Sequence, residues 1–323
     1  MKQSRLIATT ALVATAGFAN ADVAVSGYAK AGLVYNSEGL TSTRMLSSAA
    51  VTFDASGESD GGLTFGFNTN HIVTNNGTVD NDDTTVYMSG AFGKMSFGAV
   101  AEADEVAGLS DIGWDGLDVD DVAEALVGDE LGDLYGVGLG HNVNYTYATG
   151  PVVFSLSGQV ATGHGTDDVE SYAAGIKYSF GDAYVGLGYA DHQMNLEDAQ
   201  VVSVYGGGSF GAIKVAALYA DANHTLSGIG YNAQSYGVNA SYTMDALTLS
   251  VGLGRADFDA ATSLADQKSM GIGAAYSLGG GASVHFGIAQ VESVSDENLS
   301  IANQKIGAGV KETRADVGVK FSF

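Results

Sequence analysis

The chain has 323 residues, with 37 acidic side chains against 13 lysines and arginines, so its formal net charge is −24. This charge argues against nucleic acid as a partner, because nucleic acid is itself a polyanion, and favours cations as counter-ions or permeants. The absence of cysteine excludes disulfides and thiolate metal sites. The 46 glycines and single proline suit a chain of paired strands, because proline breaks the ladders between strands.

Residues 1–21 have the pattern of a secretory signal peptide. Lys2 and Arg5 give the segment a positive start, residues 6–18 form a short apolar stretch, and residues 19–21 read Ala-Asn-Ala. The apolar stretch is too short for a membrane-spanning helix. The small-x-small ending favours cleavage over a signal anchor, so we expect the mature chain to begin at Asp22.

The mature part, residues 22–323, is expected to form one transmembrane β-barrel domain. Its apolar residues alternate with small polar ones in segments of about ten residues, the length of a tilted strand that crosses the hydrocarbon layer. Short glycine turns such as residues 92–94 separate the segments, in alternation with longer polar loops such as residues 221–232. We count sixteen segments. The segments at 85–92 and 95–100 are short, and without them the count would be fourteen. Sixteen antiparallel strands would enclose an aqueous lumen.

The longest connection, residues 101–141, is acidic and alternates least. It contains Trp114, which is the only tryptophan, and many leucines and valines, which gain little from full exposure. We therefore expect it to fold into the lumen and narrow it, with a solvated surface loop as the alternative. It has no lysine or arginine, and its acids are Glu102, Asp104, Glu105, Asp111, Asp115, Asp118, Asp120, Asp121, Glu124, Asp129, Glu130 and Asp133.

Strand parity places most of the basic side chains on the inner wall. Hydration alone would favour that placement, since a charge on the lipid face costs roughly 2–4 kcal/mol near the midplane. Opposite the acidic loop, these cations would create a transverse field that disfavours apolar solutes. The candidates are Lys30, Arg44, Lys177, Lys214, Arg314 and Lys320.

Two patterns bear on metal binding. Asp118, Asp120 and Asp121 resemble the beginning of a calcium loop without the spacing of an EF-hand, and so are candidates for a structural calcium site. No cofactor is required. The histidines show no pair with ligand spacing on one face, so we interpret them as surface or lumen side chains. They are His71, His141, His164, His192, His224 and His285.

Nothing in the chain points clearly to catalysis. Residues 206–211 match the glycine pattern of a dinucleotide site, but residues 213–219 alternate as a strand where that site needs a helix. The chain has no G-x-S-x-G motif, so a Ser-His-carboxylate hydrolase rests only on the residue inventory. We therefore expect no enzyme, and keep a barrel enzyme or a purely structural anchor as minor alternatives.

The pattern of the last strand indicates which of its two faces meets lipid. From Arg314 to Phe323, apolar side chains at odd positions alternate with small or charged ones at even positions. This strict period of two predicts an apolar face toward lipid and a polar face toward water.

Four stretches resemble the general porins of Rhodobacter-type alphaproteobacteria. They are residues 85–94 (TVYMSGAFGK), 184–189 (YVGLGY), 278–283 (LGGGAS) and 316–323 (DVGVKFSF), and their order and spacing extend the resemblance over the whole mature length.

The resemblance implies a sixteen-stranded homotrimer in the outer membrane of a Gram-negative bacterium, in contact with membrane lipid and lipopolysaccharide. It implies passive diffusion of small hydrophilic solutes through one pore per subunit, with the acidic third loop facing basic wall residues and calcium among the acids. Lys30 and Arg44 fall where the family carries wall arginines. The wall cations are fewer here, so we expect a stronger cation preference. A solute-specific channel is the alternative, but lumen-facing positions are mostly Gly, Ser, Thr and Asn instead of a row of aromatics.

Overall fold

The computed structural model describes residues 22–37, 41–73, 79–80, 84–106, 113–117, 127, 140–160, 170–194, 197–226, 229–259, 266–292 and 311–323. The predicted signal peptide lies outside these ranges. Among the described residues, no helix is both long and apolar enough to cross a membrane.

The described chain is almost entirely β-strand. Sixteen long strands form one sheet, which the two-residue β4 (Val79–Asp80) extends beside β3, and the short helix α1 (Ala103–Val106) follows β6. The long strands are β1 (Asp22–Asn36), β2 (Thr43–Glu58), β3 (Thr64–Val73), β5 (Thr84–Gly90), β6 (Gly93–Val100), β7 (His141–Thr149), β8 (Val152–Gln159), β9 (Glu170–Phe180), β10 (Ala183–Met194), β11 (Glu197–Phe210), β12 (Ile213–Leu226), β13 (Ile229–Met244), β14 (Leu247–Phe258), β15 (Gln267–Gly279), β16 (Ala282–Glu292) and β17 (Lys311–Ser322).

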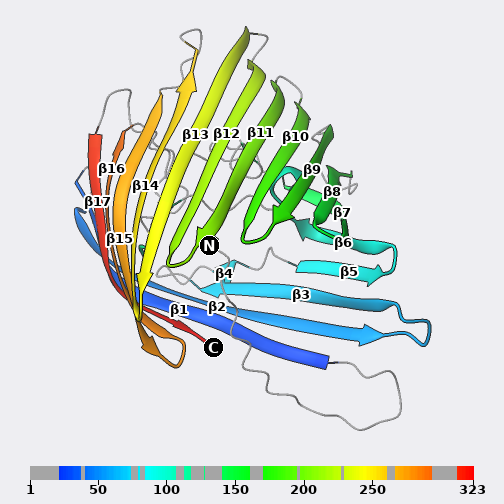
Figure 1. Ribbon diagram of the computed structural model, residues 1–323, viewed down its shortest axis with the longest axis horizontal. Coiled ribbons are helices and arrows are strands. Elements are labelled where there is room, and N and C mark those ends of the chain that lie inside the picture. The colour runs from blue at the N-terminus through cyan, green and yellow to red at the C-terminus, as the bar shows by residue number, and fades with distance from the viewer. Residues whose placement is uncertain are drawn as a thin grey trace.

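The sheet closes on itself. Every neighbouring pair is antiparallel, and β1 pairs with both β2 and β17 (Figure 1). Phe323 extends this closure, because its N–H and C=O both bond to the backbone of Gly27, at 3.0 and 2.8 Å. A closed sheet leaves no strand edge and satisfies every ladder internally, as a hydrocarbon environment demands. The predicted sixteen-strand barrel is confirmed.

The short turns lie where the glycines predict them. Gly181 and Gly211, in the turns after β9 and β11, have φ values of 61° and 65°, which glycine adopts without steric cost. Asp245, after β13, is the only described residue other than glycine with a positive φ, at 49°. Tight turns at this end alternate with longer connections at the other end, the usual arrangement of transmembrane barrels.

The two faces of the wall differ as the alternation predicts. Large apolar side chains stand on the outer face, where Leu187, Val202 and Ile272 are each more than half exposed. In the last strand Val317 and Phe321 are on this face, while the even-numbered positions turn inward. An apolar surface of this extent on every strand is a lipid-facing surface.

The packed core lies inside the barrel. Its buried side chains come from the inner wall, mainly alanines, and from the connection after β6, including Trp114, Leu117 and Val127. The connection between β6 and β7 therefore supplies much of the apolar surface that the small side chains of the wall cover.

Candidate functional site

The connection between β6 and β7 first contacts the wall at its own beginning. Helix α1 packs against β8, β9 and β10. Ala103 N–H donates to Ser157 Oγ at 2.7 Å, and Asn144 Nδ2 donates to the carbonyl of Ala101 at 3.2 Å. The start of the loop is thus bonded to the wall through its backbone.

A second segment, residues 113–117, lies on a different part of the wall. The Gly113 carbonyl accepts from Asn239 Nδ2 of β13 at 3.0 Å. Asp115 N–H donates to Ser250 Oγ of β14 at 2.6 Å. Both wall side chains bond to loop backbone, so the path of the main chain is fixed independently of most loop side chains.

Glycines form the floor beneath this segment. The indole of Trp114, which is only 3% exposed, lies on Gly252 and Gly271. The backbone of Asp115 lies so close to Gly273 that a Cβ there would overlap it. The loop can approach the wall this closely only because these positions carry no side chain.

The segment ends against β1 and β17. Leu117 N–H donates to Asp316 Oδ2 at 2.8 Å, and the Leu117 carbonyl accepts from Lys30 Nζ at 2.9 Å. The Leu117 side chain lies over Gly32 and Gly318, and an added Cβ at Gly318 would be 2.6 Å from it. One residue thus binds an acid and a base of the inner wall at once.

These two attachments of the described loop segments lie on opposite sides of the barrel. Around the ring, β9 and β17 are eight long strands apart in both directions, so they are opposite each other. Helix α1 sits on the wall around β9, and Leu117 sits on β17 and β1. The described parts of the loop lie inside the barrel, and a solvated surface loop is wrong for them.

The structure locates four of the twelve predicted loop acids. Glu102, Asp104 and Asp115 are buried, and Glu105 is partly buried. The other eight, which include Asp118, Asp120 and Asp121 of the predicted calcium site, lie outside the described residues. Glu102 lies beside His141 and His192 of the wall, and Asp104 packs on Gly188 of β10.

Four of the six predicted wall cations gather on three adjoining strands. Lys30 and Lys320 are register partners on β1 and β17. Arg44 of β2 is the partner of Val34, two positions from Asn36, which is the partner of Arg314. All four are on inward positions of the wall that residues 113–117 contact, so most of the six candidate cations gather on that side of the barrel.

The remaining two predicted cations lie elsewhere on the inner face. Lys177 of β9 places Nζ 4.6 Å from the centre of the Tyr184 ring, a cation–π contact. Lys214 of β12 is next to the turn at residues 211–212. Neither adjoins the cluster on β1, β2 and β17, so the six do not form one continuous patch.

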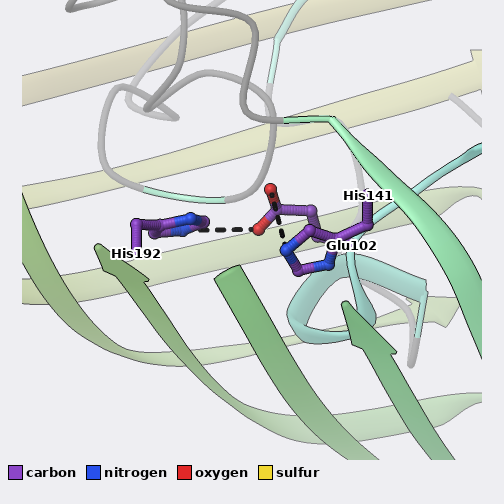
Figure 2. Close-up of side chains that lie close together, drawn as sticks. All are labelled: Glu102, His141 and His192. Carbon is purple, nitrogen blue, oxygen red and sulfur yellow. Dashed lines mark ion pairs between the residues drawn. The ribbon is translucent and has the colours of Figure 1, made fainter. Parts of the chain in front are cut away.

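The structure also contains a cluster of one acid and two histidines that the spacing of these residues in the sequence did not predict. Glu102, His141 and His192 come from the loop, β7 and β10, and all three are buried (Figure 2). Glu102 Oε1 is 3.7 Å from His141 Nε2, and Glu102 Oε2 is 3.5 Å from His192 Nε2. From the sequence, we interpret all six histidines as surface or lumen side chains. His141 and His192 are instead buried side by side next to Glu102, because pairing of strands brings together residues that no short motif links.

A comparison with known proteins now decides the family. A model described as Gram-negative porin matches residues 8–296. The chain belongs to the Gram-negative porin family. It is also 30% identical to a porin of Rhodobacter capsulatus, over 94% of this chain and 100% of that protein.

Solved porins share the fold. A porin structure refined at 1.8 Å resolution has 28% identity and a TM-score of 0.71, with 93% of this chain and 100% of that chain covered. An anion-selective porin from Comamonas acidovorans has 15% identity and a TM-score of 0.76, with 94% and 100% covered. This porin is accordingly an outer-membrane diffusion pore and not an enzyme.

One contact resembles part of a hydrolase site, but the burial of its residues argues against catalysis. Ser171 Oγ is 2.6 Å from His192 Nδ1, and His192 lies beside Glu102. However, Ser171 is 5% exposed and the histidine is fully buried. A nucleophile must reach its substrate, and this serine instead forms part of the interior wall.

Proposed function

We propose that this porin is a passive, general-diffusion pore for small hydrophilic solutes and ions, which prefers cations. The acidic loop, residues 101–141, narrows the lumen and faces basic residues of the wall. The observation that carries the proposal is the path of the loop, which is bonded to the walls around β9 and around β17 on opposite sides of the barrel.

Charge, and not the fold, supports the cation preference. The anion-selective porin from Comamonas acidovorans has the same fold at 15% identity, so the barrel is compatible with either selectivity. In this chain acids outnumber lysines and arginines by 37 to 13, and none of the basic residues is in the loop. A narrow, water-filled passage lined by an excess of carboxylates concentrates cations.

The wall supplies the opposing charge in the same region. Lys30 bonds to the backbone of Leu117, and Lys320 is the register partner of Lys30. Ammonium groups on one side and loop carboxylates on the other would orient water across the passage. Polar solutes fit such ordered water, and apolar solutes disrupt it.

The first test is electrical. Purified protein in a planar bilayer with a KCl gradient should give large, linear conductance steps and a reversal potential of the sign expected for cation selectivity. Small steps blocked by one particular solute would instead favour a solute-specific channel, and no steps would favour a closed barrel.

Charge removal locates the selectivity. Replacing Asp118, Asp120 and Asp121 together with Asn should move the reversal potential toward zero. The matched control replaces Asp191, Asp221 and Asp257 with Asn, which removes the same charge from outward positions. Equal shifts in the two triple variants would mean that the selectivity arises from net charge and not from the loop.

We also propose that the protein is a homotrimer embedded in outer-membrane lipid and lipopolysaccharide, as the resemblance implies. Conductance steps in groups of three and a trimer mass in mild detergent would support the trimer, and single steps from a monomeric species would contradict it. Calcium at Asp118, Asp120 and Asp121 stays a prediction, to be checked by equilibrium dialysis of wild type and the triple Asn variant with calcium.

A further inference from the structure

Three side chains that can bind a metal ion lie close together where the two ends of the loop meet. One ligand atom from each of Glu102, His141 and His192 lies within 4.8 Å of the other two. The side chains of all three have no exposed surface. Figure 2 shows the carboxylate between the two imidazoles. Two imidazoles and one carboxylate are a common donor set for zinc and related divalent transition cations.

The distances fit a shared ion better than direct contact. A charge-assisted N–H···O bond is about 2.7–2.9 Å long, whereas the Nε2 to carboxylate oxygen distances are 3.5 and 3.7 Å. Zinc bonds of about 2.0–2.1 Å place neighbouring tetrahedral ligands about 3.4 Å apart. The three groups therefore already have nearly the separation that an ion between them requires.

Serine hydroxyls hold the imidazoles from behind. His141 Nδ1 is 2.6 Å from Ser157 Oγ, and His192 Nδ1 is 2.6 Å from Ser171 Oγ. With both Nδ1 atoms protonated and donating to these hydroxyls, each Nε2 carries a lone pair. His192 Nε2 is 3.5 Å from Glu102, and His141 Nε2 is 3.7 Å from Glu102 and 2.6 Å from Ser171 Oγ, which a metal ion would replace as its partner. Such outer partners, which fix tautomer and ring orientation, are typical of histidine metal ligands.

The same contacts also allow a proton arrangement without a metal ion. Ser171 Oγ is also 2.6 Å from His141 Nε2. If His141 donates to Ser171 and Ser171 donates to His192 Nδ1, then His192 Nε2–H faces Glu102 at 3.5 Å. In that arrangement the His192 N–H is farther from the carboxylate than a hydrogen bond allows, whereas a cation would bind both Nε2 atoms and the carboxylate together.

We propose that Glu102, His141 and His192 form a binding site for a divalent transition cation, with zinc as the expected occupant and water at the fourth position. The ion would join the first residues of the loop to His141, which begins β7 directly after the loop, and to β10. It would link the two ends of the loop, at Glu102 and His141, which are 39 positions apart in the sequence (141 − 102). This site is distinct from the predicted calcium site and does not depend on the selectivity proposed above.

The test is zinc binding by the purified full-length protein after removal of bound metal with a chelator. Titration calorimetry should give one tight zinc per chain. Cobalt(II), used as a substitute, should give the intense visible absorption of a tetrahedral site. Glu102→Gln and His192→Asn should each weaken zinc binding at least 100-fold, and Ser171→Ala should weaken it about 10–100-fold through loss of the outer partner.

His285→Asn is the matched control. His285 is also a buried, inward-facing histidine bonded to a serine, with Nε2 2.8 Å from Ser283 Oγ, but it lies on β16. Its replacement should leave the tight zinc unchanged. The mobility of unheated protein on a detergent gel shows whether each variant is a folded barrel, and His192→Gln is a second variant if His192→Asn does not fold.

Two results would overturn the site. One is wild-type protein that binds no tight zinc and gives no tetrahedral cobalt spectrum. The other is tight binding that Glu102→Gln and His192→Asn leave as strong as His285→Asn does. Either would assign the cluster to a metal-free hydrogen-bonded contact between loop and wall.

Discussion

The loop inside this porin is held by two walls with different chemistry. Around β9 the contact is made by buried polar side chains: Glu102, two histidines and two serines. Around β15 and β17 it is made by loop backbone lying on glycines, with single hydrogen bonds at each step. The first contact depends on groups that are present, and the second depends on side chains that are absent.

The two contacts should therefore be disrupted by different kinds of substitution. A polar network fails when one member is deleted, because the remaining buried groups lose their partners. A glycine floor fails when something is added, because a packed interior has no room for it. Trp114 can distinguish the two failures. It is the only tryptophan, and it lies buried on the glycine floor.

The largest effect on the position of the loop and on conductance is expected from Gly273→Val. The new side chain would overlap the backbone of Asp115, and overpacking of this kind costs roughly 1–3 kcal/mol. We expect residues 113–117 to leave the wall, so that Trp114 emission shifts to the red and single-channel conductance rises. Both are measured on purified protein, by fluorescence and in planar bilayers.

The control for this change is Ala275→Val. Ala275 lies on the same inward row of β15, two residues along the strand. It should accept the larger side chain with little change in either signal. If Gly273→Val and Ala275→Val gave the same emission and conductance, the glycine floor would not be what holds the loop.

An intermediate effect is expected from Ser171→Ala at the other wall. Ser171 Oγ contacts both His141 Nε2 and His192 Nδ1. Loss of a hydroxyl that serves buried groups costs about 1–3 kcal/mol. The free energy of unfolding, measured by urea titration in detergent, should fall by that amount while Trp114 emission in the folded protein stays unchanged.

Ser203→Ala provides the comparison for that measurement. The Ser203 hydroxyl is also buried, but it has no hydrogen-bond partner among the described residues. Its removal should be neutral or slightly stabilising. A loss of stability in Ser203→Ala as large as in Ser171→Ala would mean that the histidine contacts add nothing beyond packing.

The smallest effect is expected from Lys30→Met. It removes one charged, partly buried hydrogen bond to the Leu117 carbonyl, worth about 1.5 kcal/mol. It also removes a cation beside the loop, so the reversal potential in a KCl gradient should move toward stronger cation selectivity. Lys214→Met removes the same charge near the turn at residues 211–212 and should move it less. A larger shift in Lys214→Met would place the selective region nearer that turn.

The sequence predicted the barrel because its information is local. The alternation at residues 314–323 assigns Val317 to the outer face and Asp316 to the inner face, whatever strand lies beside them. Glycine turns mark the ends of strands for the same reason, because φ is a property of one residue. The apolar residues of the loop, with Trp114 among them, predicted burial inside the barrel, and Trp114 is buried there.

The wall residues that the loop contacts could not be predicted in the same way. Gly273 and Gly318 look like any other small inward residues of a barrel strand. Their role depends on which loop atoms lie above them, and those atoms belong to residues 115 and 117. The sequence assigned Glu102 and Asp104 to the constriction with the other acids, but the fold buries both against the wall.

The sequence by itself therefore determined the strands, their faces, the closed barrel and the excess of negative charge. Only the tertiary structure decided which distant residues come together inside the barrel. His141 and His192 are 51 residues apart (192 − 141) and come together with Glu102 through the register of four neighbouring strands and the path of one loop. Alternation records the environment of each residue, whereas such contacts arise from pairing between distant segments, which no local pattern encodes.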